Sequence, residues 1–294
     1  MASTRFTLDL RTAGMFSNVN EVIQYLHLAE TEGFQFHVTW KWSCYGEQER
    51  PGNPWEYYFE QCFDTGSWTD DPPLLPVGKP VACARDNIIT PRLRDRQCAP
   101  LLLPVDRHLP HRYISRYLRL NAATRQVVDD FARTFDGRRV IGVHIRGEGR
   151  VHGGAAAMMN AKGRRELSSD FERYFQQIDG QLKPGDNSAV FVCSDSQDIV
   201  DRMVERYADR VILYPATRSA FGEMHAGHAR NAGETFPRFK LGQDVLVEAY
   251  LLARSDYFIH GNSNVANFVL CCNPALPSHY IYEQEMQAII ASAQ

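Results

Sequence analysis

Apolar positions along the chain alternate between the two-residue period of strands and the longer period of helices. At the N-terminus, Arg5–Leu10 and Phe34–Trp40 have the pattern of strands. Between them the apolar positions recur at helical spacing, at Val19, Val22, Ile23, Leu26 and Ala29. Ser17 is expected to cap this helix and Gly33 to end it. Such a strand–helix–strand unit opens a doubly wound α/β domain.

The second half of the chain repeats this alternation. Short apolar runs predict buried parallel strands at Val140–Ile145, Ala189–Ser194, Val211–Leu213, Tyr257–His260 and His279–Tyr282. Helical patterns lie between them, among them an apolar one over Gly242–Arg254, and Ser196 is expected to cap the one that follows the second strand. Tyr214–Lys240 is expected to be a long loop that acts as a lid or binding segment. A helix capped by Asn121 and closed by Gly137 joins the two halves. We therefore expect an α/β protein of two domains, residues 1–130 and residues 131–294.

Two segments of the first half depart from this alternation. Lys41–Pro80 is expected to be a loop, since it has six prolines among its aromatic residues. These aromatics are Trp42, Tyr45, Trp55, Tyr57, Tyr58, Phe59 and Trp68. They favour packing of the loop onto a core over stacking on sugars. Arg85–Leu120 is basic. A helix in this segment would have Tyr113 and Ile114 on its apolar face, and its arginine-bearing face is expected to be solvated. The alternative is docking of Arg107–Leu120 on anionic lipid or on a charged acceptor.

Composition narrows the class of protein. The chain has 294 residues, of which 44% are hydrophobic and 23% charged, as in an ordinary globular enzyme. The net charge of −3 gives no general attraction to nucleic acid. No apolar run approaches the ~20 residues that span a bilayer, and the first residues lack a signal-peptide pattern. Seven cysteines without a C-x-x-C pair predict reduced thiols and a cytoplasmic protein.

Four groups of polar residues would meet if the predicted strands lie side by side with their carboxyl ends together. They are His144, Arg146 and Glu148; Ser194 and Asp195; Glu248; and Gly261, Asn262, Ser263 and Asn264. Ligands of open α/β sheets bind at this edge. The backbone N–H groups at the start of the helix after Gly261 could hold an anion there.

Each charged candidate also has a structural interpretation. An arginine grips phosphate oxygens two at a time, but Arg146 could equally stand in an internal ion pair. Asp195 could cap the helix that follows it. Glu248 lies in an apolar helical stretch, so its carboxylate needs a donor, from the protein or from a ligand.

Metal binding receives little support from the sequence. His108 and His111 have H-x-x-H spacing, as do His225 and His228, but neither pair has a carboxylate nearby in a helix or strand. No G-x-S-x-G, no G-x-G-x-x-G after the first strand and no P-loop motif occurs. We expect no metal.

Four stretches together resemble the α1,6- and protein O-fucosyltransferase superfamily, and most closely its nodulation (NodZ-type) members. They are HVTWKWSCY, VIGVHIRGEG, FVCSDS and VLVEAYLLARSDYFIHGNSNVANF. The resemblance covers most of the chain and is weak between Gly46 and Val105. It implies two Rossmann-like domains facing across a cleft (the GT-B arrangement), GDP-fucose as donor, inversion at the anomeric carbon, and no metal or other cofactor.

The resemblance also implies roles for individual residues. Arg146 would hold the donor diphosphate with His144 beside it, and Asp195 would lie near the donor. Glu248 would replace the superfamily's base-contacting aspartate. The phosphate end of the donor would be lined by Asn262, Ser263, Asn264 and Val265.

The catalytic base is less well matched. The superfamily often has a second basic residue and an Asp-Lys pair after the first arginine, whereas Gly147, Glu148 and Gly149 follow here. Glu148 is the best candidate for the general base, and Asp195 is the second.

The acceptor would be a glycan, a lipid-linked sugar or another glycoconjugate, as in polysaccharide biosynthesis, and the sequence does not identify it. Two alternatives remain open for the function. One is a transferase that uses another GDP- or UDP-activated sugar. The other is a non-catalytic nucleotide-sugar-binding protein with the same fold.

Overall fold

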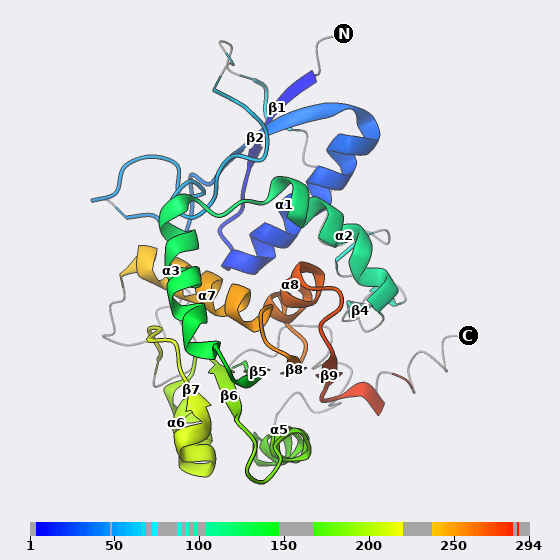
Figure 1. The fold of residues 1–294 in the computed structure, drawn as a ribbon. Coiled ribbons are helices and arrows are strands. Elements are labelled where there is room, and N and C mark those ends of the chain that lie inside the picture. The colour runs from blue at the N-terminus through cyan, green and yellow to red at the C-terminus, as the bar shows by residue number, and fades with distance from the viewer. Residues whose placement is uncertain are drawn as a thin grey trace.

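Two parallel sheets with a layer of helices between them form the body of the molecule (Figure 1). The structure, a computed structural model, describes residues 4–47, 49–66, 68, 72–75, 87–89, 92–93, 97–98, 104–146, 167–219, 237–284 and 287. The mixed α/β class with parallel sheets that the sequence predicts is confirmed.

The N-terminal unit consists of β1 (Thr4–Asp9), α1 (Met15–Glu32) and β2 (Phe34–Thr39). The two strands pair in parallel along their whole length. Helix α1 ends at Gly33, which has the left-handed φ of 76° typical of a glycine C-cap. The predicted cap at Ser17 is wrong, because the helix begins at Met15 without a side-chain cap. The Tyr45 hydroxyl accepts the Met15 N–H instead, at 2.9 Å.

The second sheet has five strands, all parallel, in the order β7-β6-β5-β8-β9. They are β5 (Arg139–His144), β6 (Ser188–Cys193), β7 (Val211–Ile212), β8 (Tyr257–His260) and β9 (Ser278–Tyr280). The chain therefore runs outward from β5 to one side and then returns to build the other side from β8. Strand order reverses between β5 and β8, the place where doubly wound folds bind their ligands.

Helices cover both faces of this sheet. One face carries α5 (Leu167–Gln181) and α6 (Gln197–Tyr207), and the other carries α7 (Arg238–Leu252) and α8 (Asn264–Cys272). Alternate residues of the strands serve the two cores. Val190 and Val192 pack with α5 and α6, while Ala189, Phe191 and Cys193 belong to the core with α7 and α8. This two-sided burial explains the unbroken apolar runs in the sequence.

The remaining elements lie beside these layers. They are β3 (Arg92–Leu93) and β4 (Gln97–Cys98), an antiparallel pair, α2 (Pro104–Tyr117), α3 (Ala122–Ala132), and the short 3₁₀ turns Arg133–Phe135 and Ala208–Arg210. Asn121 caps α3 as predicted, accepting the Thr124 N–H at 2.9 Å. The cap position of Ser196 at the start of α6 is also confirmed, but its hydroxyl makes no cap hydrogen bond.

One continuous core joins the N-terminal unit to α7 and α8. The rings of Phe16 in α1 and Phe268 in α8 lie 4.6 Å apart, and α2 and α3 pack on α8 and α7. The predicted division between residues 130 and 131 falls inside α3 and stays a prediction.

A second contact joins the halves at the first turn of α7. The Phe239 N–H donates to Glu47 Oε1 at 2.9 Å, and the Tyr58 hydroxyl donates to the Phe239 carbonyl at 2.9 Å. The rings of Tyr58 and Phe239 stack with centroids 5.4 Å apart. We call these three residues the α7 clasp. It explains why α7 starts at Arg238, four residues before the predicted Gly242.

Aromatic residues of the predicted loop mostly pack inward, as expected. Trp55, Tyr58 and Phe59 are fully buried, whereas Trp42 is 75% exposed. Apolar residues of α2, including Tyr113 and Ile114, are also buried in the core.

The exposed face of α2 is basic. Arg112 and Arg116 of this helix form ion pairs with Glu30 of α1. Because Tyr113 and Ile114 are buried, docking on lipid through Arg107–Leu120 would depend on such charges and on Leu109, which is 40% exposed. Among the described helices, none is both long enough and apolar enough to cross a bilayer.

Candidate functional site

Residues predicted for the site lie at the carboxyl edge of the five-stranded sheet, where strand order reverses. His144 is the last residue of β5, and it pairs in register with His260, the last residue of β8. Arg146 follows two residues after β5, and Ser263 lies just before α8. The predicted meeting of the first and fourth groups at one edge is therefore confirmed by the topology.

His144 is buried and neutral. The Tyr174 hydroxyl donates to its carbonyl at 3.1 Å, and its Nδ1 lies 3.4 Å from Ser263 Oγ. Burial, together with the charge of Arg146 and the ring of His260, lowers the pKa of His144 from 6.5 to about 3. This side chain can therefore form hydrogen bonds in the site, but it does not carry charge at neutral pH.

Arg146 and Asp195 form an ion pair, with Nε and Oδ2 3.7 Å apart. The two side chains are 31% and 23% exposed, so both can be reached from solvent. The ion pair that was the structural alternative for Arg146 is therefore present, with Asp195 as its partner. The cap position of α6 belongs to Ser196 and not to Asp195.

Ser263 caps the start of α8. Ser263 Oγ accepts the Ala266 N–H at 2.9 Å, which leaves the hydroxyl hydrogen to point elsewhere. Asn20 Nδ2 of α1 donates to the Asn264 carbonyl at 3.2 Å. Val265 is buried and Asn262 is partly exposed. The backbone N–H groups at this helix start lie near His144, and the N-terminus of a helix is a position that favours an anion.

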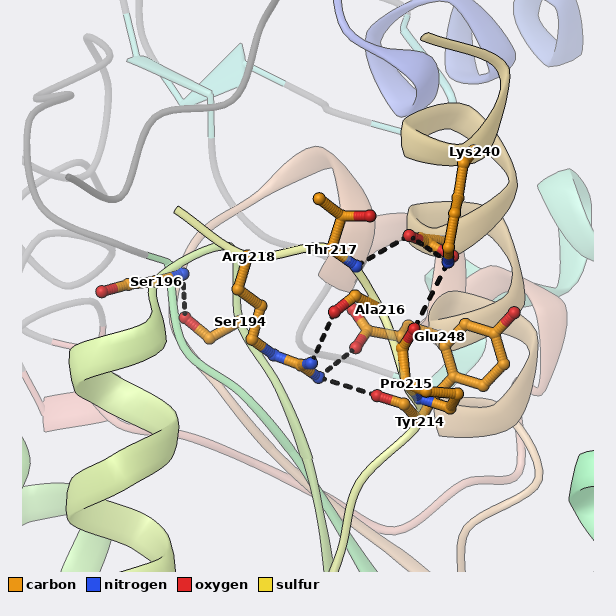
Figure 2. A network of polar contacts seen from close by, with 10 residues as sticks. Ser194, Ser196, Tyr214, Pro215, Ala216, Thr217, Arg218, Lys240 and Glu248 are labelled. Carbon is orange, nitrogen blue, oxygen red and sulfur yellow. Dashed lines mark hydrogen bonds and ion pairs between the residues drawn. The ribbon is translucent and has the colours of Figure 1, made fainter. Parts of the chain in front are cut away.

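Glu248 has the donor that its burial requires. Its Oε1 lies 3.0 Å from Arg218 Nη2, and both side chains are at least nine-tenths buried. Figure 2 shows the Arg218 guanidinium pointing at Glu248 and at the carbonyls of Tyr214 and Ala216. Burial raises the pKa of Glu248 to about 8, although the charge of Arg218 opposes the shift.

Arg218 belongs to a segment, Tyr214–Ser219, that lies along α7; we call it the strap (Figure 2). The Thr217 N–H donates to Asp244 Oδ2 at 2.8 Å, and Lys240 Nζ binds both oxygens of the same carboxylate, at 2.7 and 2.9 Å. Asp244 and Glu248 are four residues apart, so both face the strap from one side of α7. Arg218 and Asp244 are not among the residues predicted from the sequence, because neither belongs to a motif or lies at the end of a predicted strand.

The N-terminal half also approaches the site. Burial raises the pKa of Tyr45, whereas the positive charge of Arg146 acts in the opposite direction. The turn that follows β2 therefore lies near Arg146, although 100 residues separate them in sequence.

Three sequence predictions lie outside the described residues. They concern the base candidate Glu148, the pair His225 and His228, and most of the long segment between Ser219 and Pro237. Of the other histidine pair, His111 Nδ1 donates to the Cys271 carbonyl at 3.0 Å. Among the described residues, no three His, Cys, Asp or Glu side chains gather as a metal site would need.

Comparison with solved structures identifies the fold. No family model and no curated protein matches the chain. The NodZ α1,6-fucosyltransferase soaked with GDP-fucose aligns with a TM-score of 0.55 and 19% identity, over 92% of this chain and 93% of that one. The NodZ fucosyltransferase from Bradyrhizobium aligns at 0.54 and 18%, over 91% and 92%. POFUT1 in complex with GDP aligns at 0.51 and 12%, over 95% and 99%. The chain has a fucosyltransferase fold.

These matches confirm the predicted resemblance, including its NodZ-like character, at the level of fold. They extend over nearly the whole chain, so both halves take part. At these identities the comparison supports no assignment of individual residues.

Proposed function

We propose that this protein is an inverting glycosyltransferase that moves fucose from GDP-fucose to a glycan, lipid-linked or other glycoconjugate acceptor without a metal. The observation that carries the proposal is the placement of Arg146, Asp195 and the start of α8 around the β5/β8 reversal point. Similarity to solved fucosyltransferases, described with GDP and GDP-fucose, supports the donor.

The chemistry requires positive charge where the leaving group forms. Glycosyl transfer passes through an oxocarbenium-like state and releases a diphosphate with added negative charge. In our proposal the Arg146 guanidinium and the N–H groups that begin α8 stabilise that charge. Neutral His144 holds Ser263 and does not compete for the phosphate. Glu148 is the proposed general base, with Asp195 as the second candidate.

Glu248 is proposed to recognise the base of the donor. Guanine presents N1–H and its amino group side by side, and a carboxylate accepts both, whereas uracil and adenine lack this pair of donors. Arg218 occupies one site on Oε1, and a carboxylate has about four lone-pair positions, so the base can still bind. With another base Glu248 would keep Arg218 as a partner, but its remaining lone pairs would face a base without the two matching donors, which disfavours other nucleotides.

The other parts of the proposal concern the acceptor and the location. Residues 1–130 would form the acceptor-side domain and residues 131–294 the donor-side domain, facing across a cleft. The protein would act in the cytoplasm, with the exposed arginines of Arg107–Leu120, which are Arg112, Arg116 and Arg119, facing an anionic membrane surface. We propose no nucleic-acid partner.

A nucleotide screen tests the donor. GDP at about 100 times its Kd contributes roughly 2.7 kcal/mol of stability, so we expect GDP to raise the melting temperature by several degrees, and UDP and ADP to leave it unchanged. Hydrolysis of GDP-fucose, GDP-mannose and UDP-sugars then ranks the sugar. Equal shifts with UDP would overturn the guanine assignment.

Two further results would identify the alternatives. GDP binding without hydrolysis or transfer of any sugar would favour the non-catalytic protein. Loss of transfer in EDTA, with recovery on adding Mn²⁺ or Mg²⁺, would overturn the metal-free mechanism.

A further inference from the structure

The strap connects two parts of the candidate site that are far apart in the sequence. Arg218 forms an ion pair with Glu248 of α7. Its neighbour Ser219 binds the backbone around Asp195, since the Ser219 N–H donates to the Asp195 carbonyl at 3.0 Å and the Gln197 N–H donates to the Ser219 carbonyl at 3.0 Å. Neighbouring residues of one segment therefore bind both candidate acids of the donor site.

Arg218 also fixes the shape of the strap. Its Nη1 donates to the Ala216 carbonyl at 2.8 Å and its Nη2 to the Tyr214 carbonyl at 3.1 Å. A guanidinium has its donors in one rigid plane, so these contacts and the bond to Glu248 set one geometry together. Lysine could supply the charge, but it has no planar fork.

The strap has a second attachment to α7 that does not involve Arg218. Asp244 accepts the Thr217 N–H, and Lys240 Nζ donates to the Pro215 carbonyl at 3.3 Å. Asp244 is buried, and Lys240 compensates its charge. Loss of Arg218 alone should therefore loosen the strap without removing it from α7.

We propose that Arg218 is a positioning residue of the donor site, which holds the strap on α7 and so fixes Glu248 and Asp195 relative to each other. This inference rests on the proposed function, since it assigns these two acids to the donor. It explains why a buried arginine is kept where an apolar side chain would fill the space at no cost in desolvation.

Two substitutions separate the charge of Arg218 from its geometry. Arg218→Gln removes the charge, and Arg218→Lys keeps a cation near Glu248 but loses the fork. The matched control is Arg254→Gln, which breaks a half-exposed ion pair with Asp129 just beyond the end of α7.

Amide hydrogen exchange measures the strap without any nucleotide. In Arg218→Gln and Arg218→Lys we expect exchange at Ser219, and to a lesser extent at Thr217, to become about tenfold faster, the change expected for loss of one or two hydrogen bonds. The control should retain the parent rates. Parent rates at both amides in both Arg218 variants would overturn the proposal.

GDP affinity as a function of pH distinguishes a positioning role from a merely structural one, because substitution of a merely structural arginine would leave the pH profile unchanged. The charged groups facing Glu248 are Arg218 and Lys240, which lower its pKa, and Asp244 and Asp195, which raise it; Cys193 and Tyr214 also adjoin it. In the parent, GDP should bind more tightly as pH rises to about 8 and Glu248 ionises. Arg218→Gln should bind GDP about tenfold more weakly at neutral pH, and its GDP affinity should rise only at a higher pH than in the parent. Arg218→Lys should also bind GDP more weakly, but its affinity should rise at nearly the same pH as in the parent.

The outcomes separate the two proposals. A parent that binds no GDP contradicts the proposed function, and the exchange rates still decide the role of Arg218 in the strap. A parent that binds GDP, with an unchanged affinity and pH profile in Arg218→Gln, overturns the positioning role. If Arg218→Gln does not fold, the double variant Arg218→Met/Glu248→Leu removes both buried charges; it should fold and show the faster exchange at Ser219, and parent rates there would overturn the proposal.

Discussion

Arg146 is the residue on which the proposed chemistry depends most. We expect Arg146→Lys to lose roughly 2–4 kcal/mol of transition-state stabilisation, the typical effect of removing one preorganised donor, because lysine keeps the charge without the two-pronged grip. The measurement is kcat for transfer, beside the melting temperature. Arg254→Lys is the control, since Arg254 has the same type of carboxylate partner away from the site. A rate within about threefold of the parent would show that Arg146 serves only its ion pair with Asp195.

His144 and His260 should make the protein sensitive to acid. Burial lowers their pKa values to about 3 and about 4, from 6.5 in the unfolded chain. The unfolded chain therefore takes up protons first as the pH falls. Stability should be complete above about pH 6.5 and fall between there and about pH 4, by about 1.4 kcal/mol per pH unit for each histidine.

Denaturant unfolding at several pH values measures this slope. His260→Gln should remove about half of the pH slope that the two histidines produce together. Substitution of His108, which is exposed, should leave the slope unchanged in His108→Gln. An unchanged slope in His260→Gln would mean that other groups dominate acid unfolding.

Single residues were predictable from the sequence where a strand end or a helix start marked them. Arg146 and Ser263 are of this kind, since each follows a strand with a clear apolar pattern. Arg218 was not predictable, because its role depends on a carboxylate 30 residues away. The need of Glu248 for a partner was correctly inferred from its apolar neighbours, but the identity of that partner required the fold.

At the scale of elements, the strands of the second sheet were predicted within a residue or two, and β8 agrees at both ends. Helix starts were less accurate. Helix α1 begins before its predicted cap at Ser17, and α7 begins before its predicted start at Gly242, since Tyr45 and the α7 clasp satisfy their first turns from a distance. No local pattern contains such contacts.

The α7 clasp predicts that alanine substitutions at two helical glycines, Gly180 and Gly242, change stability in opposite directions. Replacing glycine by alanine within a helix commonly stabilises a protein by roughly 0.5–1 kcal/mol. Gly180 of α5 should behave in this way, since a Cβ there would meet nothing within 4 Å. A Cβ at Gly242 of α7 would clash with the Tyr58 hydroxyl oxygen, so Gly242→Ala must displace the clasp.

We therefore expect Gly180→Ala to raise and Gly242→Ala to lower the free energy of unfolding, the latter by about 1–3 kcal/mol, as is typical of overpacking. Combining Gly242→Ala with Tyr58→Leu tests the cause, because removal of the ring should make the added cost of the alanine disappear. Equal effects of the two alanine substitutions would contradict this account.

For the whole molecule, the sequence predicted two α/β units but not how they join. The contact of Phe16 with Phe268 links residues far apart in sequence, and periodicity carries no information about it. We expect residues 1–130 and 131–294, expressed separately, to lack the cooperative unfolding of the intact chain, since each exposes half of the shared core. Calorimetry of the two fragments measures this. Two sharp transitions, one from each fragment alone, would show that the halves are independent.

The shared helical layer also bears on how such a protein could be altered by recombination. Exchanging everything before residue 131 with a relative would pair foreign versions of α1 and Tyr58 with resident versions of α8 and Phe239, and every mismatch would fall inside one core. A graft that carries α7 and α8 along with residues 1–130 would keep that core native, but it would also transfer Glu248 and Ser263. Under the proposed function, a chimera built to change the acceptor alone would thus import part of the proposed donor site, and the two specificities would be inherited together.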